Sequence, residues 1–139
     1  MENKNEEKEM NAKPTSPTIE QVLKMMEKNL GEEPRPMVLM SKLVPEMVLR
    51  QAQDRKFVFD MLTIPPKYKH LICIAVASAV SSHMCTETFM KIAKRSGVTK
   101  DEIAEAIITA RFALGSTVFA SATEGMEYLT RGDDANVKD

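Results

Sequence analysis

The sequence predicts an all-α protein, and three observations support this prediction. No segment shows sustained alternation of polar and apolar residues, the period-two pattern typical of strands. Apolar residues instead recur at helical spacing between N-cap residues, first-turn prolines and terminal glycines. The 139 residues, 43% apolar and 28% charged, suit one globular domain. We expect a single helical domain over residues 18–131, a disordered N-terminal arm over 1–17 and a flexible tail over 132–139.

The N-terminal part of this domain is expected to hold two helical segments. The first begins after Thr18, a plausible N-cap, and ends at Gly31. The second covers Met37 to Met61, and we expect a break near Pro45 because proline costs about 3 kcal/mol in a helix interior. Pro36 suits the first turn of this second segment.

The next segment begins at Pro66 and contains the longest nearly apolar run, Leu71 to Val80. Taken alone, that run fits a buried strand as well as a helix. Pro66 suits a helical first turn, and the segment to Ser81 is long and rich in alanine and serine, so we favour a helix. A helix that is apolar on nearly every side is expected at the centre of the fold. The run is too short to span a bilayer, which takes about 17–25 residues, so we expect no membrane association.

Two further helices are expected before the C-terminal tail. Thr99 and Glu102 form a capping box that opens the first of them. Gly115 and Ser116 are expected to separate it from a last helix that ends near Arg131. The first helix places apolar side chains on two neighbouring stripes: Ile103, Ile107 and Leu114, with Ala104, Ile108 and Phe112 beside them.

Composition and charge exclude several classes of function. The 19 basic and 20 acidic residues give a net charge of −1, and aromatic residues are 5%, which argues against nucleic-acid binding. Two cysteines are too few for a disulfide-rich secreted scaffold, and the polar N-terminus has no signal-peptide core, so we expect a cytoplasmic protein. The two histidines and two cysteines match no zinc spacing, and no glycine-rich phosphate loop occurs. We therefore expect neither a metal nor a cofactor.

Cys85 is the first candidate for chemistry. Ser82 can cap a helix from His83 to Arg95 that closes at Gly97, which places Cys85 in its first turn. Unpaired N–H groups and the positive end of the helix dipole stabilise a thiolate at such a position. The other interpretation is that Cys85 is a small buried hydrophobic residue, as most free cysteines are.

The two histidines and the second cysteine complete the set of candidates. His83 lies two residues before Cys85, and His70 lies in the preceding helix. Cys73 shares a helix face with His70, but it lies within the apolar run and is expected to be buried and unreactive. A disulfide between Cys73 and Cys85 stays open, because the sequence does not fix the distance between their Cα atoms.

From residue 62 to residue 129 the chain resembles the carboxymuconolactone decarboxylase family, which includes the alkylhydroperoxidase D-like proteins. Two runs carry this resemblance: IPPKYKHLICIAVA at residues 64–77 and GVTKDEIAEAI at residues 97–107. Cys85, Ala93 and Gly115 fall at matching positions. The resemblance implies an alkylhydroperoxidase D-like helical bundle and a homo-oligomer, a trimer or a hexamer.

The resemblance also implies roles for individual residues. Redox members of the family carry a Cys-x-x-Cys motif at the start of a helix and reduce peroxides through its second cysteine, while a glutamate and a histidine relay protons. Here the second cysteine is Cys85, Ser82 takes the place of the first, and Phe89 takes the place of the histidine. His70 stands at the glutamate position, where an imidazole could deprotonate Cys85.

We therefore expect a thiol-dependent peroxidase of the peroxiredoxin type that acts as an antioxidant oxidoreductase. Cys85 would become a sulfenic acid, and an external thiol or Cys73 would reduce it again. One alternative is a non-catalytic oligomeric binding or assembly module whose methionine-rich N-terminal part supplies subunit contacts. A lyase of the carboxymuconolactone decarboxylase type is a further alternative.

Overall fold

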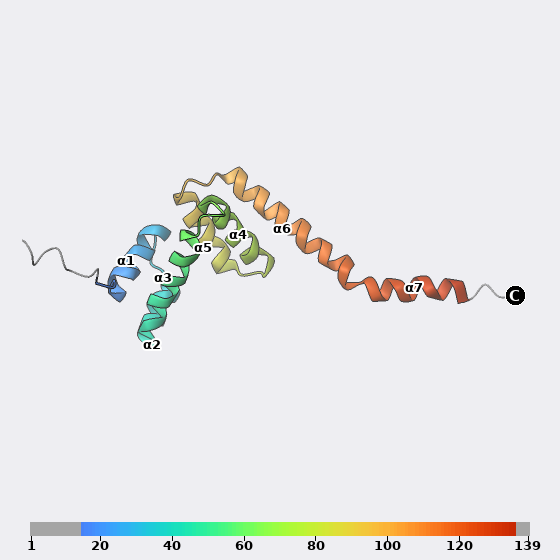
Figure 1. Ribbon diagram of the computed structural model, residues 1–139, viewed down its shortest axis with the longest axis horizontal. Coiled ribbons are helices and arrows are strands. Elements are labelled where there is room, and N and C mark those ends of the chain that lie inside the picture. The colour runs from blue at the N-terminus through green and yellow to red at the C-terminus, as the bar shows by residue number, and fades with distance from the viewer. Residues whose placement is uncertain (1–14, 136–139) are drawn as a thin grey trace, which may run out of the picture. The chain divides into compact units, whose positions relative to one another are not determined.

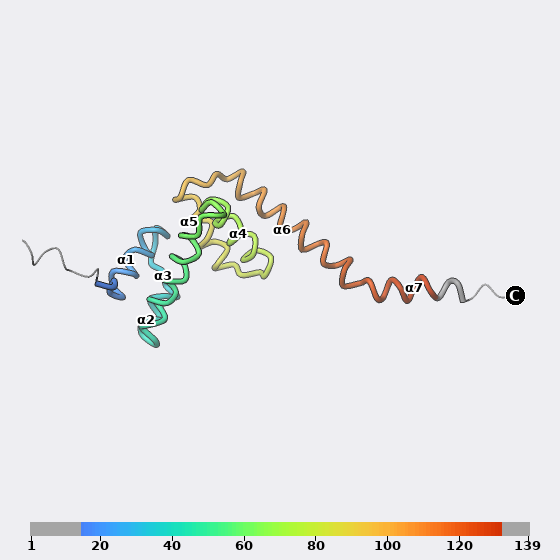
Figure 2. Tube along the Cα trace, viewed as in Figure 1, coloured from blue at the N-terminus to red at the C-terminus, as the bar shows by residue number. Residues whose placement is uncertain are grey.

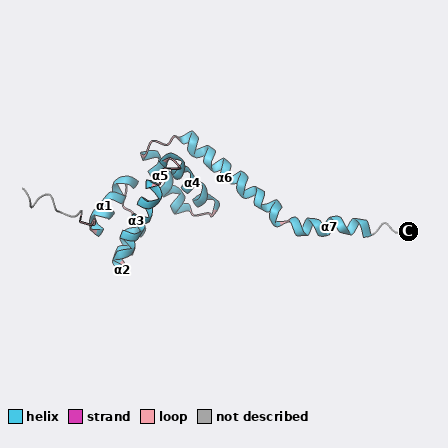
Figure 3. Cartoon of the chain, viewed as in Figure 1, coloured by secondary structure: helices cyan, strands magenta, loops and turns pink. Residues whose placement is uncertain are grey.

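The structure, a computed structural model, describes residues 15–135, and the side chains of residues 15–131. All seven regular elements in this described part are α-helices, which confirms the predicted fold class (Figures 1 and 3). The chain divides into two compact units, Met1–Asp60 and Met61–Asp139. Apart from residues 15–17, the predicted N-terminal arm lies outside the described residues, whereas the last helix continues past Arg131 to Ala135.

The first unit contains α1 (Ile19–Leu30), α2 (Arg35–Leu43) and α3 (Pro45–Asp60). Thr18 caps α1 as predicted: its Oγ1 accepts the Gln21 N–H at 3.2 Å, and the Gln21 side chain accepts the Thr18 N–H at 2.9 Å. These two bonds satisfy amide groups that have no partner inside the helix. The helix ends at Gly31, whose φ of 88° is the left-handed conformation that glycine adopts without steric cost.

The predicted break near Pro45 is confirmed. Val44 leaves the helical conformation between α2 and α3, because a following proline disfavours the α region for the residue before it. The buried side chains of the helices in this unit are Val22, Leu30 and Val48. Helix α1 packs mainly against α3.

The second unit contains α4 (Pro66–Ala79), α5 (His83–Arg95), α6 (Lys100–Ser121) and α7 (Thr123–Ala135). Helix α4 packs against both α5 and α6, as its predicted central place requires, but Tyr68, Ile72 and Val76 leave one side of it exposed. The core consists of Ile74 from α4, Ala93 from α5, Ile103 from α6 and Val98 from the connection between α5 and α6. Burial of a large aliphatic side chain contributes about 1.5–3 kcal/mol, so these contacts position the helices of the unit.

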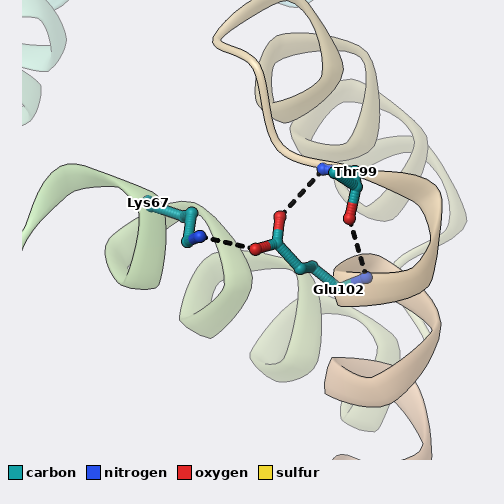
Figure 4. Close-up of polar contacts among 3 residues, drawn as sticks. All are labelled: Lys67, Thr99 and Glu102. Atoms are coloured by element: carbon teal, nitrogen blue, oxygen red, sulfur yellow. Dashed lines mark hydrogen bonds and ion pairs between the residues drawn. The ribbon is translucent and has the colours of Figure 1, made fainter.

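An ion pair joins the starts of α4 and α6 (Figure 4). Thr99 and Glu102 form the predicted capping box: Oγ1 of Thr99 accepts the Glu102 N–H at 3.2 Å, and Oε2 of Glu102 accepts the Thr99 N–H at 2.9 Å. The other carboxylate oxygen, Oε1, accepts a hydrogen bond from Nζ of Lys67 at 2.5 Å. One side chain therefore both caps α6 and attaches it to α4.

The predicted helix boundary at Gly115 and Ser116 is wrong. Helix α6 runs through both residues to Ser121, and the chain breaks only at Ala122. Glycine lowers helix stability by about 1 kcal/mol relative to alanine, and neighbouring helix-forming residues such as Ala113 and Leu114 offset this cost. The Ser116 hydroxyl donates a hydrogen bond to the Phe112 carbonyl at 3.0 Å, so Ser116 is also accommodated inside the helix.

Most of α6 and α7 is exposed. Of the apolar stripes expected on α6, only Ile103 is buried, and every described side chain from Arg111 to Arg131 is exposed. We call residues 111–131 the C-terminal arm; in Figure 2 it leaves the packed α4–α5 pair. Among the described residues, α6 is long and apolar enough to cross a membrane by length and composition alone, with 6% of that stretch buried.

Replacing Thr99 by alanine removes the oxygen that caps α6, so the chain should lose about 1 kcal/mol of unfolding free energy. Thr109→Ala is a matched control, because Thr109 is an exposed threonine inside the same helix. We expect this control to change stability by at most about 0.5 kcal/mol. Urea unfolding followed by circular dichroism measures both variants, and equal losses would contradict the capping role.

The ion pair predicts a pH dependence of stability. The Lys67 ammonium and the Thr99 N–H lower the pKa of Glu102, and Glu102 in turn raises the pKa of Lys67. A lowered carboxyl pKa stabilises the fold above the ordinary value of 4.5, and this contribution disappears as the pH falls through the lowered value.

Between pH 7 and pH 3, the melting temperature of the wild type should therefore fall further than that of Glu102→Gln. The control is Glu105→Gln, an exposed carboxylate one turn along the same helix. The melting temperature of this control should fall as steeply with pH as that of the wild type. Parallel curves for wild type and Glu102→Gln would show that the ion pair contributes nothing.

Candidate active site

A tight turn sets the position and direction of α5. Helix α4 ends at Ala79, and the following Ser81 has a φ of 59°, the one described non-glycine residue with a positive φ. The Ser82 N–H then donates to the Ala77 carbonyl at 2.9 Å, a bond that closes the end of α4. Left-handed backbone costs a residue with a side chain about 1–2 kcal/mol, so this turn is strained next to the candidate site.

Ser82 is the N-cap of α5, as predicted, but its hydroxyl makes no capping hydrogen bond. Its carbonyl accepts the Thr86 N–H at 2.9 Å, the first bond inside the helix. The N–H groups of the first turn are therefore not occupied by the Ser82 side chain and leave the positive end of the helix dipole open.

Cys85 lies in this first turn and is exposed. The interpretation of Cys85 as a buried hydrophobic residue is therefore wrong. Its neighbours His83 and Met84 are exposed as well. Because residues two apart on a helix do not face each other, His83 and Cys85 point to different sides of α5.

The other sequence-predicted residues lie on α4. His70 is buried, and Cys73 is half-buried, which is less than we expected. Both cysteines are free thiols, so the disulfide left open by the sequence is not formed in this structure. Since α4 packs against α5, the structure places His70 in the buried layer and Cys85 at the surface of the same helix pair.

Lys69, which was not among the residues predicted for the site, is as buried as its neighbour His70. Its Nζ donates a hydrogen bond to the Met61 carbonyl, which fixes the segment that leads into α4. Among the described residues, no buried side-chain nitrogen or oxygen lacks a hydrogen-bond partner. The sequence does contain a pattern that predicts this burial, because the buried residues of α4 recur at helical spacing: Lys69, His70, Ile74 and Ala77. A lysine is normally assigned to the surface because of its charge, so the pattern was not recognised.

Phe89 stands at the position where the resemblance implies a histidine in the redox members of the family, and it is partly buried. Its side chain packs against the cluster formed by Ile74, Ala93, Val98 and Ile103. At this position the chain therefore has an apolar side chain that stabilises the α4–α5 contact. Proton transfer at Cys85, if it occurs, must use another group.

No metal centre is present in the described part of the chain, because no three of its histidine, cysteine, aspartate and glutamate residues could hold an ion together. The site thus consists of one exposed thiol at a helix N-terminus, with a buried imidazole on the helix packed beside it.

Comparison with known proteins agrees with this architecture. The profile of the carboxymuconolactone decarboxylase family matches residues 55–127, slightly before the limits of 62 and 129 expected from the sequence. The chain belongs to this family. Uncharacterized protein 4 in the cox locus of Paracoccus denitrificans is 32% identical over 80 residues, which cover 58% of this chain and 72% of that protein.

A solved structure extends the comparison to the fold of nearly the whole chain. It is a provisionally assigned carboxymuconolactone decarboxylase from Burkholderia xenovorans LB400, which matches with a TM-score of 0.59 and 21% sequence identity. The match covers 83% of this chain and 98% of the other. This member of the carboxymuconolactone decarboxylase family therefore has the fold that the two sequence runs indicated.

The turn before the site offers a test of its strain. Ser81→Gly should be neutral or slightly stabilising, because glycine adopts a positive φ without steric cost. Ser81→Val should cost at least about 1–2 kcal/mol, because a β-branched side chain is poorly accommodated there. Chemical unfolding of the two variants measures the difference, and equal stabilities would show that the turn relaxes to an unstrained conformation.

Proposed function

We propose that this protein is a thiol-dependent peroxidase that reduces small peroxides through Cys85. The observation that carries the proposal is the exposed thiol in the first turn of α5, at a helix end that the Ser82 side chain leaves open. Helix N-termini favour negative charge, and the thiolate is the nucleophilic form of cysteine. Membership of a family that includes peroxide-reducing proteins supports the same chemistry.

The proposed reaction is a two-electron transfer from sulfur to peroxide. The Cys85 thiolate attacks the terminal oxygen of ROOH, an S–O bond forms, and the O–O bond breaks. The alkoxide that leaves takes up a proton and departs as ROH. Cys85 is thereby oxidised to a sulfenic acid, and the peroxide is reduced to an alcohol, or to water when R is hydrogen.

A thiol must return the enzyme to its starting state. Serine cannot resolve a sulfenic acid, so Ser82 does not replace the first cysteine of the family motif. Cys73 is half-buried on α4, and we therefore assign the step to an external thiol. A first thiol condenses with the sulfenic acid to a mixed disulfide and water, and a second thiol releases Cys85 by exchange.

We assign proton handling to the two histidines. His70, at the position of the family's glutamate, is proposed to accept the thiol proton. His83 is exposed one helical turn or less from Cys85 and is proposed to exchange protons with solvent. Imidazole suits both roles because its ordinary pKa lies close to neutrality. We further propose that the enzyme works in the cytoplasm as a homo-oligomer, a trimer or a hexamer.

Cys85→Ser should remove peroxide consumption in the presence of an external dithiol. The matched control is Cys73→Ser, which removes the other cysteine and should consume peroxide at nearly the wild-type rate. Consumption is followed by the loss of hydrogen peroxide and of cumene hydroperoxide, with site-mapped mass spectrometry of the sulfenic acid. Equal rates for Cys85→Ser and the wild type would refute the proposal.

His70→Gln keeps a hydrogen-bonding side chain but cannot take up the thiol proton. In this variant the rate of Cys85 oxidation should therefore rise at higher pH than in the wild type. It should reach a similar plateau at a pH where the thiol loses its proton to solvent. The rate of Cys85 oxidation between pH 5 and pH 9 tests this. A superimposable pH profile would restrict His70 to a structural role.

One observation favours a second candidate, a non-catalytic assembly module on the same fold. Phe89 is partly buried and packs against the core, so an apolar packing residue stands at a proton-relay position of the family. The same exchange argues against a lyase that needs a histidine there. If Cys85 reacts with peroxide no faster than free glutathione does, the assembly module becomes the better description.

A further inference from the structure

Two ionisable side chains that follow each other in the sequence are both buried on α4. Lys69 is 6% exposed and His70 is 7% exposed, and among the described residues they are the two buried side chains that are polar or charged. The proposed mechanism uses His70 but gives no role to Lys69. Lysine is almost never fully buried in proteins unless its charge is compensated or used, so its place on the inner side of α4 needs a reason.

The hydrogen bond of Lys69 does not neutralise its charge. Nζ donates to the carbonyl oxygen of Met61, in the segment that leads into α4. A carbonyl oxygen satisfies one N–H group of an ammonium but carries no net charge. The bond therefore fixes where the ammonium lies, and the positive charge stays inside the protein.

This charge lies next to the imidazole of His70. Consecutive side chains on a helix point about 100° apart, but a charge acts through space and needs no direct contact. Because both side chains are buried, protein rather than water lies between them, and the interaction is screened much less than at a surface. A nearby positive charge and burial itself both disfavour the imidazolium form of a histidine.

The other charged groups near α4 are paired or exposed. Lys67 pairs with Glu102 at 2.5 Å, and Lys91 pairs with Glu87 at 2.8 Å, so each pair has no net charge. None of these four side chains is buried. Apart from Cys85, the other titratable or charged residues of α5 and of the first two turns of α6 are exposed: His83, Lys94, Arg95, Lys100, Asp101 and Glu105.

The remaining titratable groups of α4 do not change this picture. Tyr68 is exposed, and Cys73, one turn after His70, is a half-buried thiol. Among the described residues, Lys69 is therefore the one charged side chain that is buried beside His70.

We propose that Lys69 is a positioning residue for His70, whose imidazole its buried charge keeps in the uncharged, proton-accepting form near neutral pH. The electrostatic effect concerns His70 alone. Its consequence for Cys85 rests on the proposed function, in which His70 takes the thiol proton, because only an uncharged imidazole can do so.

The same charge also sets what happens after the proton is transferred. The S–H bond of Cys85 breaks, and its proton goes to a ring nitrogen of His70, which leaves a thiolate and an imidazolium. Lys69 repels the imidazolium, so His70 passes the proton on to the alkoxide that leaves the peroxide. His70 then acts as a transient proton carrier and does not form a lasting ion pair with Cys85.

Nuclear magnetic resonance titration of the histidine side chains in the full chain tests the effect of Lys69. In the wild type, the midpoint for His70 should lie at least about one pH unit below the ordinary value of 6.5. Lys69→Met removes the charge and should raise this midpoint by about one pH unit. Lys69→Arg keeps the charge and should leave it at the wild-type value. The resonances of His83, on exposed α5 surface, serve as an internal reference and should titrate alike in every variant.

The matched control is Lys94→Met, which removes the same charge from an exposed position on α5. Solvent screens that charge, so the midpoint for His70 should not move. A midpoint that Lys69→Met leaves in place would overturn the proposal. Equal shifts in Lys69→Met and Lys94→Met would overturn it too, because they would report the net charge of the protein rather than a local effect.

The rate of Cys85 oxidation by hydrogen peroxide between pH 5 and pH 9 tests the consequence for the thiol. In Lys69→Met the profile should move to higher pH by the same amount as the His70 midpoint, and Lys69→Arg should follow the wild type. A move to lower pH would show a lasting thiolate–imidazolium pair and overturn the proposal. If Cys85 does not react with peroxide in any variant, the proposed function fails, while the titration of His70 still decides the role of Lys69.

Nitrogen-15 chemical shifts of the wild type cover the case in which Lys69→Met does not fold. An uncharged imidazole has one protonated and one bare ring nitrogen, whereas an imidazolium has two protonated ones. At pH 6 the His70 ring of the wild type should be mostly uncharged. Two protonated nitrogens on His70 at that pH would overturn the proposal.

Discussion

The core of the second unit is built around Ile74 of α4. It is fully buried between Ala93 of α5 and Ile103 of α6, with Val98 from the connection beside them. Because these contacts come from one side of α4, they hold α5 at a fixed place beside it. The position of Cys85 follows from that packing and from the short turn at Ser81. The ion pair between Lys67 and Glu102 then fixes where α6 begins.

In this chain Cys85 lacks the second cysteine, the glutamate and the histidine that the resemblance implies for redox members of the family. Cys85 is exposed, His70 is buried, and Phe89 is partly buried against the core. Attack on a peroxide needs an accessible thiolate, so the proposed reaction depends on Cys85 losing its proton, and this step uses no metal or cofactor. What the chain lacks is a second cysteine at position 82, and this makes an external thiol part of the proposed cycle.

Exposed apolar surface is the second constraint on this molecule. Helix α4 buries Ile74 and Ala77 in its own unit and leaves Tyr68, Ile72 and Val76 exposed, while every described side chain from Arg111 to Arg131 is exposed. Only the first turns of α6 reach the core, so the side chains from Arg111 to Arg131 stay exposed.

The sequence by itself determined the all-α class, the N-cap at Thr18, the capping box at Thr99 and the break at Pro45, because each depends on contacts within a few residues. It also placed Cys85 in a helical first turn. Tertiary structure decided which side chains are buried and where α6 ends, because the spacing of apolar residues does not predict either. It buried Lys69 beside His70 and carried α6 through Gly115, because packing and neighbouring helix formers outweigh a single residue's preference. It also left most of the apolar side chains of α6 exposed to solvent. An apolar face in the sequence predicts that a helix can pack against another surface, but it does not say which surface that is.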